Sequence, residues 1–187
     1  MKPSAAALVL ANLVPLAGVL WWGWDLFAVL TLYWAENVVV GAWNVVKMLL
    51  ARSKGLAGKL FLTAFFAVHY GLFTLGHGLF LFLLFQPPGP LPDVGGMLLV
   101  LLASHGVSFF TNFLGAGERL TLTVDDLMFR PYARVVVMHL TILGGAYLVD
   151  ALGTPLGALA VLIALKTGVD LVAHLMEHRP RRPIQKL

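Results

Sequence analysis

Four ionisable side chains recur every fourth residue in segment 166–178, which closes a long apolar stretch of the chain. They are Lys166, Asp170, His174 and His178. On an α-helix this spacing places them roughly on one face. Charge inside a membrane helix is costly and usually faces the interior of a helix bundle, where a function requires it. The pattern therefore predicts a buried polar site to which other apolar segments contribute.

The composition predicts a membrane protein. The chain has 187 residues, of which 59% are hydrophobic and 12% charged. These values exclude the usual soluble globular class and favour one polytopic membrane domain over 1–187. The absence of cysteine excludes disulfides and thiolate metal ligands. Without a basic array interleaved with aromatics, no nucleic acid partner is expected. Membrane lipids are expected partners, and a homo-oligomer remains open.

The hydropathy pattern predicts an all-α fold, a polytopic membrane helical bundle of six transmembrane helices. Asp25 is expected to cap the second helix. With the N-terminus inside, every Lys and Arg except Lys166 falls on the inner side. This bias predicts two cytoplasmic termini and a multi-pass protein of the inner (cytoplasmic) membrane. The expected spans are 5–22, 26–50, 60–85, 97–114, 135–149 and 155–177, with an interfacial segment over 115–134.

Each span from the second to the sixth carries an ionisable side chain near its middle. In chain order these residues are Glu36, His69, His105, His139 and Lys166. All five fall within about one helical turn, roughly 5 Å of rise, of the predicted midplane. Five such side chains at one depth predict a common centre.

The residue types at this centre suggest a metal site. Imidazoles and carboxylates are usual ligands for zinc, iron and copper. Asp170 and His174, four residues apart, can bind one ion from a single helix. His69, His105 and His139 can complete the shell from facing helices. A transition metal ion is therefore the expected cofactor.

Glu36 and Lys166 are assigned catalytic roles at the same centre. Glu36 can serve as a ligand, an orienting group or a general base. An ammonium group beside a metal ion is repelled, so Lys166 is expected to pair with Glu36 or Asp170. A structural interpretation stays open, because intramembrane histidines often join helices by hydrogen bonds and a buried ion pair can fix helix register.

Two arginines, Arg130 and Arg134, lie in the predicted interfacial segment. They are expected to anchor the chain at the inner membrane surface. They also have the chemistry to hold an anionic headgroup.

Several short motifs lie along the chain: WAEN, HYG with a following HG, SHG, PYARVVVMH and KTGVDLVAH. With them, the chain resembles a family of bacterial multi-pass membrane proteins known only as a domain of unknown function. The resemblance covers nearly the whole chain, and it implies a class without a mechanism.

Two architectures of known activity show weaker likenesses. The seven-helix ceramidase and adiponectin-receptor hydrolases are similar in using intramembrane Ser, Asp and three His for zinc. This chain has D-x3-H-x3-H where they have H-x3-H, and one span fewer. Six-helix b-type cytochromes need same-helix His pairs with a wider spacing than that of His69 and His77, so haem is not expected.

Three functions follow from these patterns. The first is an intramembrane metal-dependent enzyme, hydrolytic or oxidative, acting on a lipid or other apolar substrate; in the hydrolytic case a metal-bound water is the nucleophile. The alternative is a proton- or ion-coupled transporter. The third is a structural or sensor subunit whose polar layer fixes helix packing.

Overall fold

The described part of the chain is helical and contains no β-strand. A computed structural model describes residues 15, 17–85, 93–153, 159, 161–165 and 168. Most of the predicted spans 5–22 and 155–177 lies outside these residues. The elements are the helices α2 (Leu26–Leu50), α3 (Leu56–Leu84) and α4 (Val94–Ser108), the π-helical turns η1 (Phe109–Gly115), the 3-10 turn η2 (Glu118–Leu120), and the helices α5 (Val124–Phe129) and α6 (Tyr132–Leu152).

Within the described residues, four helical stretches are long and apolar enough to cross a membrane. They are Leu26–Leu50, Leu56–Leu84, Gly95–Gly115 and Val124–Leu152, and they correspond to the predicted second to fifth spans. The all-α class and the membrane-like character are therefore confirmed. Six spans and cytoplasmic termini remain predictions.

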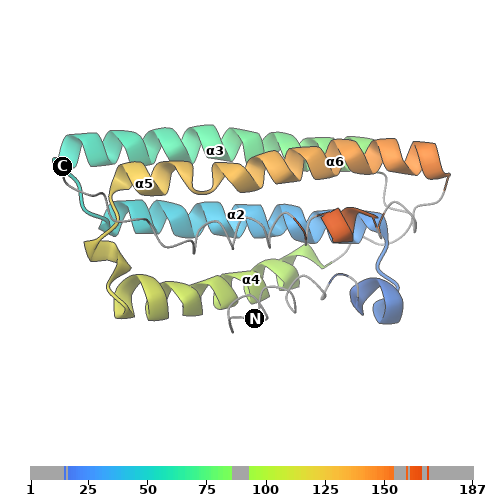
Figure 1. The fold of residues 1–187 in the computed structure, drawn as a ribbon, viewed down its shortest axis with the longest axis horizontal. Coiled ribbons are helices and arrows are strands. Elements are labelled where there is room, and N and C mark those ends of the chain that lie inside the picture. Colours follow the sequence, from blue (N-terminus) through green and yellow to red (C-terminus); the bar gives the residue numbers. More distant parts are fainter. Residues whose placement is uncertain are drawn as a thin grey trace, which may run out of the picture.

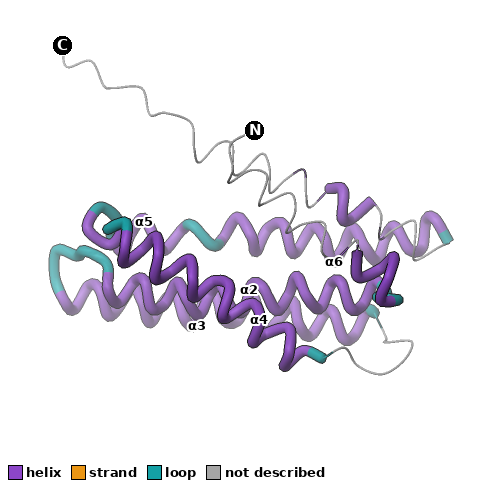
Figure 2. Tube along the Cα trace, turned by 90° about the horizontal axis from the view of Figure 1, so that it is seen from below, coloured by secondary structure: helices purple, strands orange, loops and turns teal. Residues whose placement is uncertain are grey.

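Helix α2 is the centre of the described bundle. Figure 1 shows α3 and the α5–α6 pair along one side of α2 and α4 along the other. Seen from below in Figure 2, these helices run lengthwise together. α2 packs against α3, α4, α5 and α6. Its start matches the prediction, because the Asp25 carboxylate accepts a 2.7 Å hydrogen bond from the Ala28 backbone N–H.

The fifth span begins earlier than predicted. Thr123 and Asp126 form a capping box that opens α5. Pro131 follows with helical dihedrals, φ −73° and ψ −17°. Proline is tolerated at a helix start because its missing N–H would have no partner there. The apolar helical stretch therefore runs from Val124 to Leu152, so Arg130 and Arg134 lie within it.

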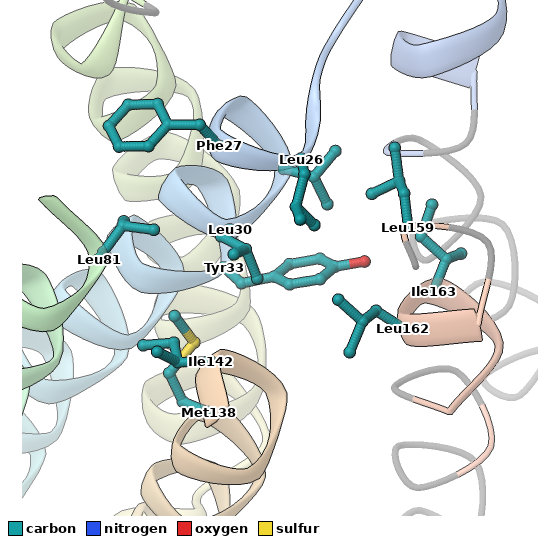
Figure 3. Packing of buried hydrophobic residues seen from close by; sticks show 11 residues of the cluster. Leu26, Phe27, Leu30, Tyr33, Leu81, Met138, Ile142, Leu159, Leu162 and Ile163 are labelled. Carbon is teal, nitrogen blue, oxygen red and sulfur yellow. The ribbon is translucent and has the colours of Figure 1, made fainter. Parts of the chain in front are cut away.

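Two apolar clusters hold the two ends of α2. The first surrounds Leu30 and Tyr33 near its start, and Figure 3 shows Met138 and Ile142 of α6 and Leu162 gathered around them. The second surrounds Met48 near the end of α2 and includes side chains of α3, η1, α5 and α6. Polar side chains occupy the length of α2 between these clusters.

Glycines allow α2 and α3 to approach closely. A Cβ atom at Gly41 would come within 2.5 Å of the Tyr70 ring, and one at Gly78 within 2.9 Å of the Trp34 ring. The Trp34 indole N–H also donates a 2.8 Å hydrogen bond to the Thr74 carbonyl. Close packing and a hydrogen bond thus join α2 to α3, which fixes the position of the polar side chains that these two helices carry.

Candidate functional site

A polar cavity lies between α2, α4 and the α5–α6 junction, and we call it the basic cavity. Its volume is about 150 Å³. One water takes up roughly 30 Å³ of liquid, so the cavity has room for a polar group of several atoms. Its lining residues are Val40, Trp43, Asn44, Lys47, His105, Ser108, Leu127, Arg130, Pro131 and Arg134.

Three cations give this cavity its character. Lys47, Arg130 and Arg134 line it, and no carboxylate is among its lining residues in the described part of the chain. Glu36 pairs with Arg134, and Glu118 acts electrostatically on Lys47. Cations predominate over carboxylates among the described residues that line the cavity, so this lining favours an anion.

The helical repeat of α2 turns one face toward the basic cavity. Val40, Trp43 and Lys47 line it at spacings of three and four residues, and Glu36 lies one turn earlier on the same face. The Trp43 indole N–H donates a 3.3 Å hydrogen bond to the Leu102 carbonyl and holds α4 against α2. The Lys47 ammonium lies 5.7 Å from the centre of the Phe113 ring, a cation–π contact that steadies its position.

An ion pair borders the basic cavity. The Arg134 guanidinium donates a 2.8 Å hydrogen bond to a Glu36 carboxylate oxygen. The two side chains are 41% and 24% exposed, so the pair is only partly shielded. Arg134 lines both the basic cavity and a small pocket containing Glu36 and Asn37. Arg134 therefore joins Glu36 to the cavity.

Asn44 fixes the opposite wall. Its side-chain amide is buried and donates a 3.1 Å hydrogen bond to the Leu127 carbonyl of α5. This bond ties α5 to α2 next to the lining residue Leu127. Arg130, three residues further along the chain, is exposed, as is Ser108 of α4. The cavity is thus open to the outside on this side.

A second polar region, which we call the histidine seam, runs between α3 and α6. Near the start of α6, a 2.7 Å hydrogen bond joins His69 Nδ1 to the Tyr132 hydroxyl. Two turns further along, His77 Nε2 lies 3.2 Å from His139 Nδ1. His77 is buried and His139 is exposed. Each of these contacts joins an imidazole to a hydroxyl or to another imidazole, without a lysine, arginine or carboxylate, in contrast to the basic cavity.

The expected metal ligands are divided between these two regions. His105 lines the basic cavity, whereas His69 and His139 belong to separate pairs of the seam. Within the described residues, no group of three or more His, Asp or Glu side chains could hold a metal ion. Asp170 and His174 lie outside the described residues, so the predicted centre as a whole remains a prediction.

Of the two expected catalytic residues, the structure describes Glu36 only. Glu36 is placed, and its cationic partner is Arg134, a residue expected at the inner membrane surface. Lys166 lies outside the described residues. The electrostatic influences on His105 come from Glu36, Arg134 and Lys47, which places the histidine within the same charged region.

Sequence reasoning missed two contributors to these regions, because Tyr132 had no assigned role and His77 was interpreted as a packing residue near the outer surface. Lys47 was placed on the same face of the second span as Glu36, but it was not expected to line a ligand site. No sequence signal paired His77 with His139, since the pairing depends on the axial offset between α3 and α6.

Comparison with protein-family models gives one match. Residues 1–186 match a family described as one of unknown function, DUF6498. This confirms the expected resemblance to an uncharacterised family. No curated protein and no solved structure matches the chain.

Proposed function

The chain belongs to this family of unknown function, and we propose that it binds the phosphate-bearing headgroup of an anionic membrane lipid in the basic cavity. The observation that carries the proposal is the convergence of Lys47, Arg130 and Arg134 on one cavity without a lining carboxylate. Arginine guanidinium groups match phosphate oxygens with two parallel N–H donors, and lysine adds a compact charge.

A lipid fits the location as well as the charge. The cavity lies near the end of α2, since Lys47 is three residues from Leu50. Basic pockets between transmembrane helices are known recognition sites for anionic headgroups. The lining residue Trp43 stacks at 4.7 Å on Phe109, and Phe110 beside it is exposed. These aromatic rings offer an apolar path for the acyl chains next to the headgroup site.

Catalysis on such a lipid remains a prediction. The lipid belongs to the substrate class expected for an intramembrane enzyme, and Glu36 next to the cavity is the candidate base. A transition metal at this centre would need Asp170 and His174 in addition. Elemental analysis of purified protein tests for the metal. An ion- or proton-coupled carrier is the alternative prediction, supported by the position of Arg134 between Glu36 and the cavity.

One observation favours a second candidate, a structural subunit. Polar groups on neighbouring helices satisfy one another in the Glu36–Arg134, His69–Tyr132 and His77–His139 pairs. Such pairs can fix helix rotation and register without any ligand. The positive excess of the basic cavity is the feature that this candidate does not explain.

Lipid binding to the full chain in an uncharged detergent tests the proposal. Native mass spectrometry would compare phosphatidylglycerol with phosphatidylcholine, which carries a phosphate but no net charge. We expect preferential retention of phosphatidylglycerol. Replacing Lys47→Gln or Arg130→Gln should weaken its binding about fivefold each, because a basic residue contributes roughly 1 kcal/mol to such an interaction.

Arg119→Gln is the matched control, since Arg119 is exposed on η2 and does not line the cavity. It should leave lipid binding unchanged. Competition with soluble glycerol phosphate separates the two sources of the anion: equal binding would identify a soluble ligand. The proposal would be refuted if the unaltered chain showed no preference for phosphatidylglycerol and if Lys47→Gln and Arg119→Gln bound this lipid equally. The structural candidate would then remain.

A further inference from the structure

The strongest feature outside the basic cavity is the contact between His77 of α3 and His139 of α6. The two nitrogens, Nε2 of His77 and Nδ1 of His139, are 3.2 Å apart. The ring centres are 5.4 Å apart and the planes are inclined by 61°. The two helices therefore bring two imidazole nitrogens face to face in the histidine seam.

The 3.2 Å between the two nitrogens is close to the distance between two nitrogen ligands of one metal ion. Zinc–nitrogen bonds measure about 2.0–2.1 Å, so two nitrogens at a tetrahedral angle are roughly 3.3 Å apart. A hydrogen bond between the imidazoles uses the same two atoms at the same distance. A small rotation of the rings converts the hydrogen-bonded pair into two ligands that face one ion.

We propose that His77 and His139 form a binding site for one divalent transition metal ion, zinc or copper(II), on the α3–α6 seam. Neutral imidazole suits these ions, and the chain contains no cysteine that would compete for them. His77 is only 5% exposed and is held between helices, which fixes the first ligand. His139 is exposed, so the remaining coordination positions open away from the bundle.

This site differs from the centre predicted from the sequence. It uses His77, which was not an expected ligand, and it omits His69 and His105. The Tyr132 hydroxyl engages His69, and His105 lines the basic cavity. The site is also independent of lipid binding, because none of the residues lining the basic cavity takes part in it.

Metal binding to the full chain provides the test. Protein purified in detergent would be treated with a chelator and titrated with zinc alone, then with copper(II) alone. We expect about one ion per chain in calorimetry and in elemental analysis after gel filtration. Zinc should also raise the midpoint of thermal unfolding, because an ion that binds only the folded state stabilises it.

The variants His77→Gln and His139→Gln should each weaken zinc binding at least tenfold and remove the thermal shift. His139 is exposed, so its variant should keep the fold, which circular dichroism would verify. His69→Gln is the matched control, because it removes an imidazole from the same seam two turns away. Equal losses in all three variants, or no retained ion in the unaltered protein, would overturn the proposal. Loss in His105→Gln and His139→Gln with none in His77→Gln would do so too, in favour of the centre predicted from the sequence.

Discussion

The basic cavity and the histidine seam lie on different sides of the same bundle. They differ in how their polar side chains are paired. In the cavity, Lys47, Arg130 and Arg134 are lining residues, and no carboxylate is among the described lining residues. In the seam, each imidazole contacts one imidazole or hydroxyl group of the neighbouring helix. Both regions contain histidine, so residue type alone does not distinguish them.

The difference shows how a ligand site can be separated from polar packing in a membrane bundle. A hydrogen-bonded pair such as His69 and Tyr132 satisfies both of its members without a ligand. In the described part of the chain, three cations line the basic cavity, and Glu36 and Glu118 act on two of them. A lining of this kind matches the anionic headgroup that we propose, because clustered cations attract an anion.

The largest effect should come from breaking the ion pair of the cavity. Arg134→Met should lower the free energy of unfolding in detergent by about 2 kcal/mol, since it removes the cation that faces Glu36. Fully buried pairs lose 3–5 kcal/mol on such a change, and the partial exposure of Arg134 reduces the effect. Adding Glu36→Gln should recover most of the loss in a denaturant titration. Strictly additive losses would show that the two side chains are not coupled.

A smaller effect is expected at the seam. In chelator-treated protein, His77→Leu should cost about 1 kcal/mol, the net contribution of an ordinary hydrogen bond. The double variant His77→Leu/His139→Leu should be nearly as stable as the unaltered chain, because both partners are then apolar. The same denaturant titration provides the measurement. A loss as large as that of Arg134→Met would place charge in the seam and remove the contrast between the regions.

The smallest effect is expected at the other pair of the seam. His69→Phe should cost about 0.5 kcal/mol, because the hydrogen bond to Tyr132 is lost while the stack on Phe65, at 5.1 Å between ring centres, can persist. Tyr132→Phe removes the other end of the same bond and should cost a similar amount. A double variant that loses clearly more than either single one would mean that the two groups have separate roles.

Helix existence was predictable from the sequence, and one boundary was predicted well. Asp25 signalled the start of the second span, and α2 covers the predicted 26–50. The helical stretch of the predicted fifth span extends to the N-terminal side of its expected start, because Asp126, Arg130 and Pro131 lie within the continuous apolar helical stretch Val124–Leu152. In the structure, Asp126 caps α5 and Pro131 occupies a helix start, where both residues are compatible with a continuing helix.

The partners of the polar residues were less predictable, for a geometric reason. Depth along the membrane is only one coordinate, and the rotation of each helix decides which neighbour a side chain meets. His69 and His139 were assigned to one layer, yet the offset between α3 and α6 pairs them with Tyr132 and His77. Lys166 was expected to pair with Glu36 or Asp170, and in the described part of the chain Glu36 pairs with Arg134.

One loop contact bears on the order in which the chain is assembled during translation. Arg52, between α2 and α3, exchanges backbone hydrogen bonds with Leu122 and Val124, and its guanidinium donates to the Leu120 carbonyl. That last partner lies 68 residues further along the chain. When the α2–α3 hairpin leaves the ribosome, the segment with Leu120, Leu122 and Val124, which bonds to this loop, has not yet been synthesised. Closure of the loop therefore waits for the second half of the chain, so a nascent chain stalled before Leu120 lacks the partners that Arg52 has in the complete fold.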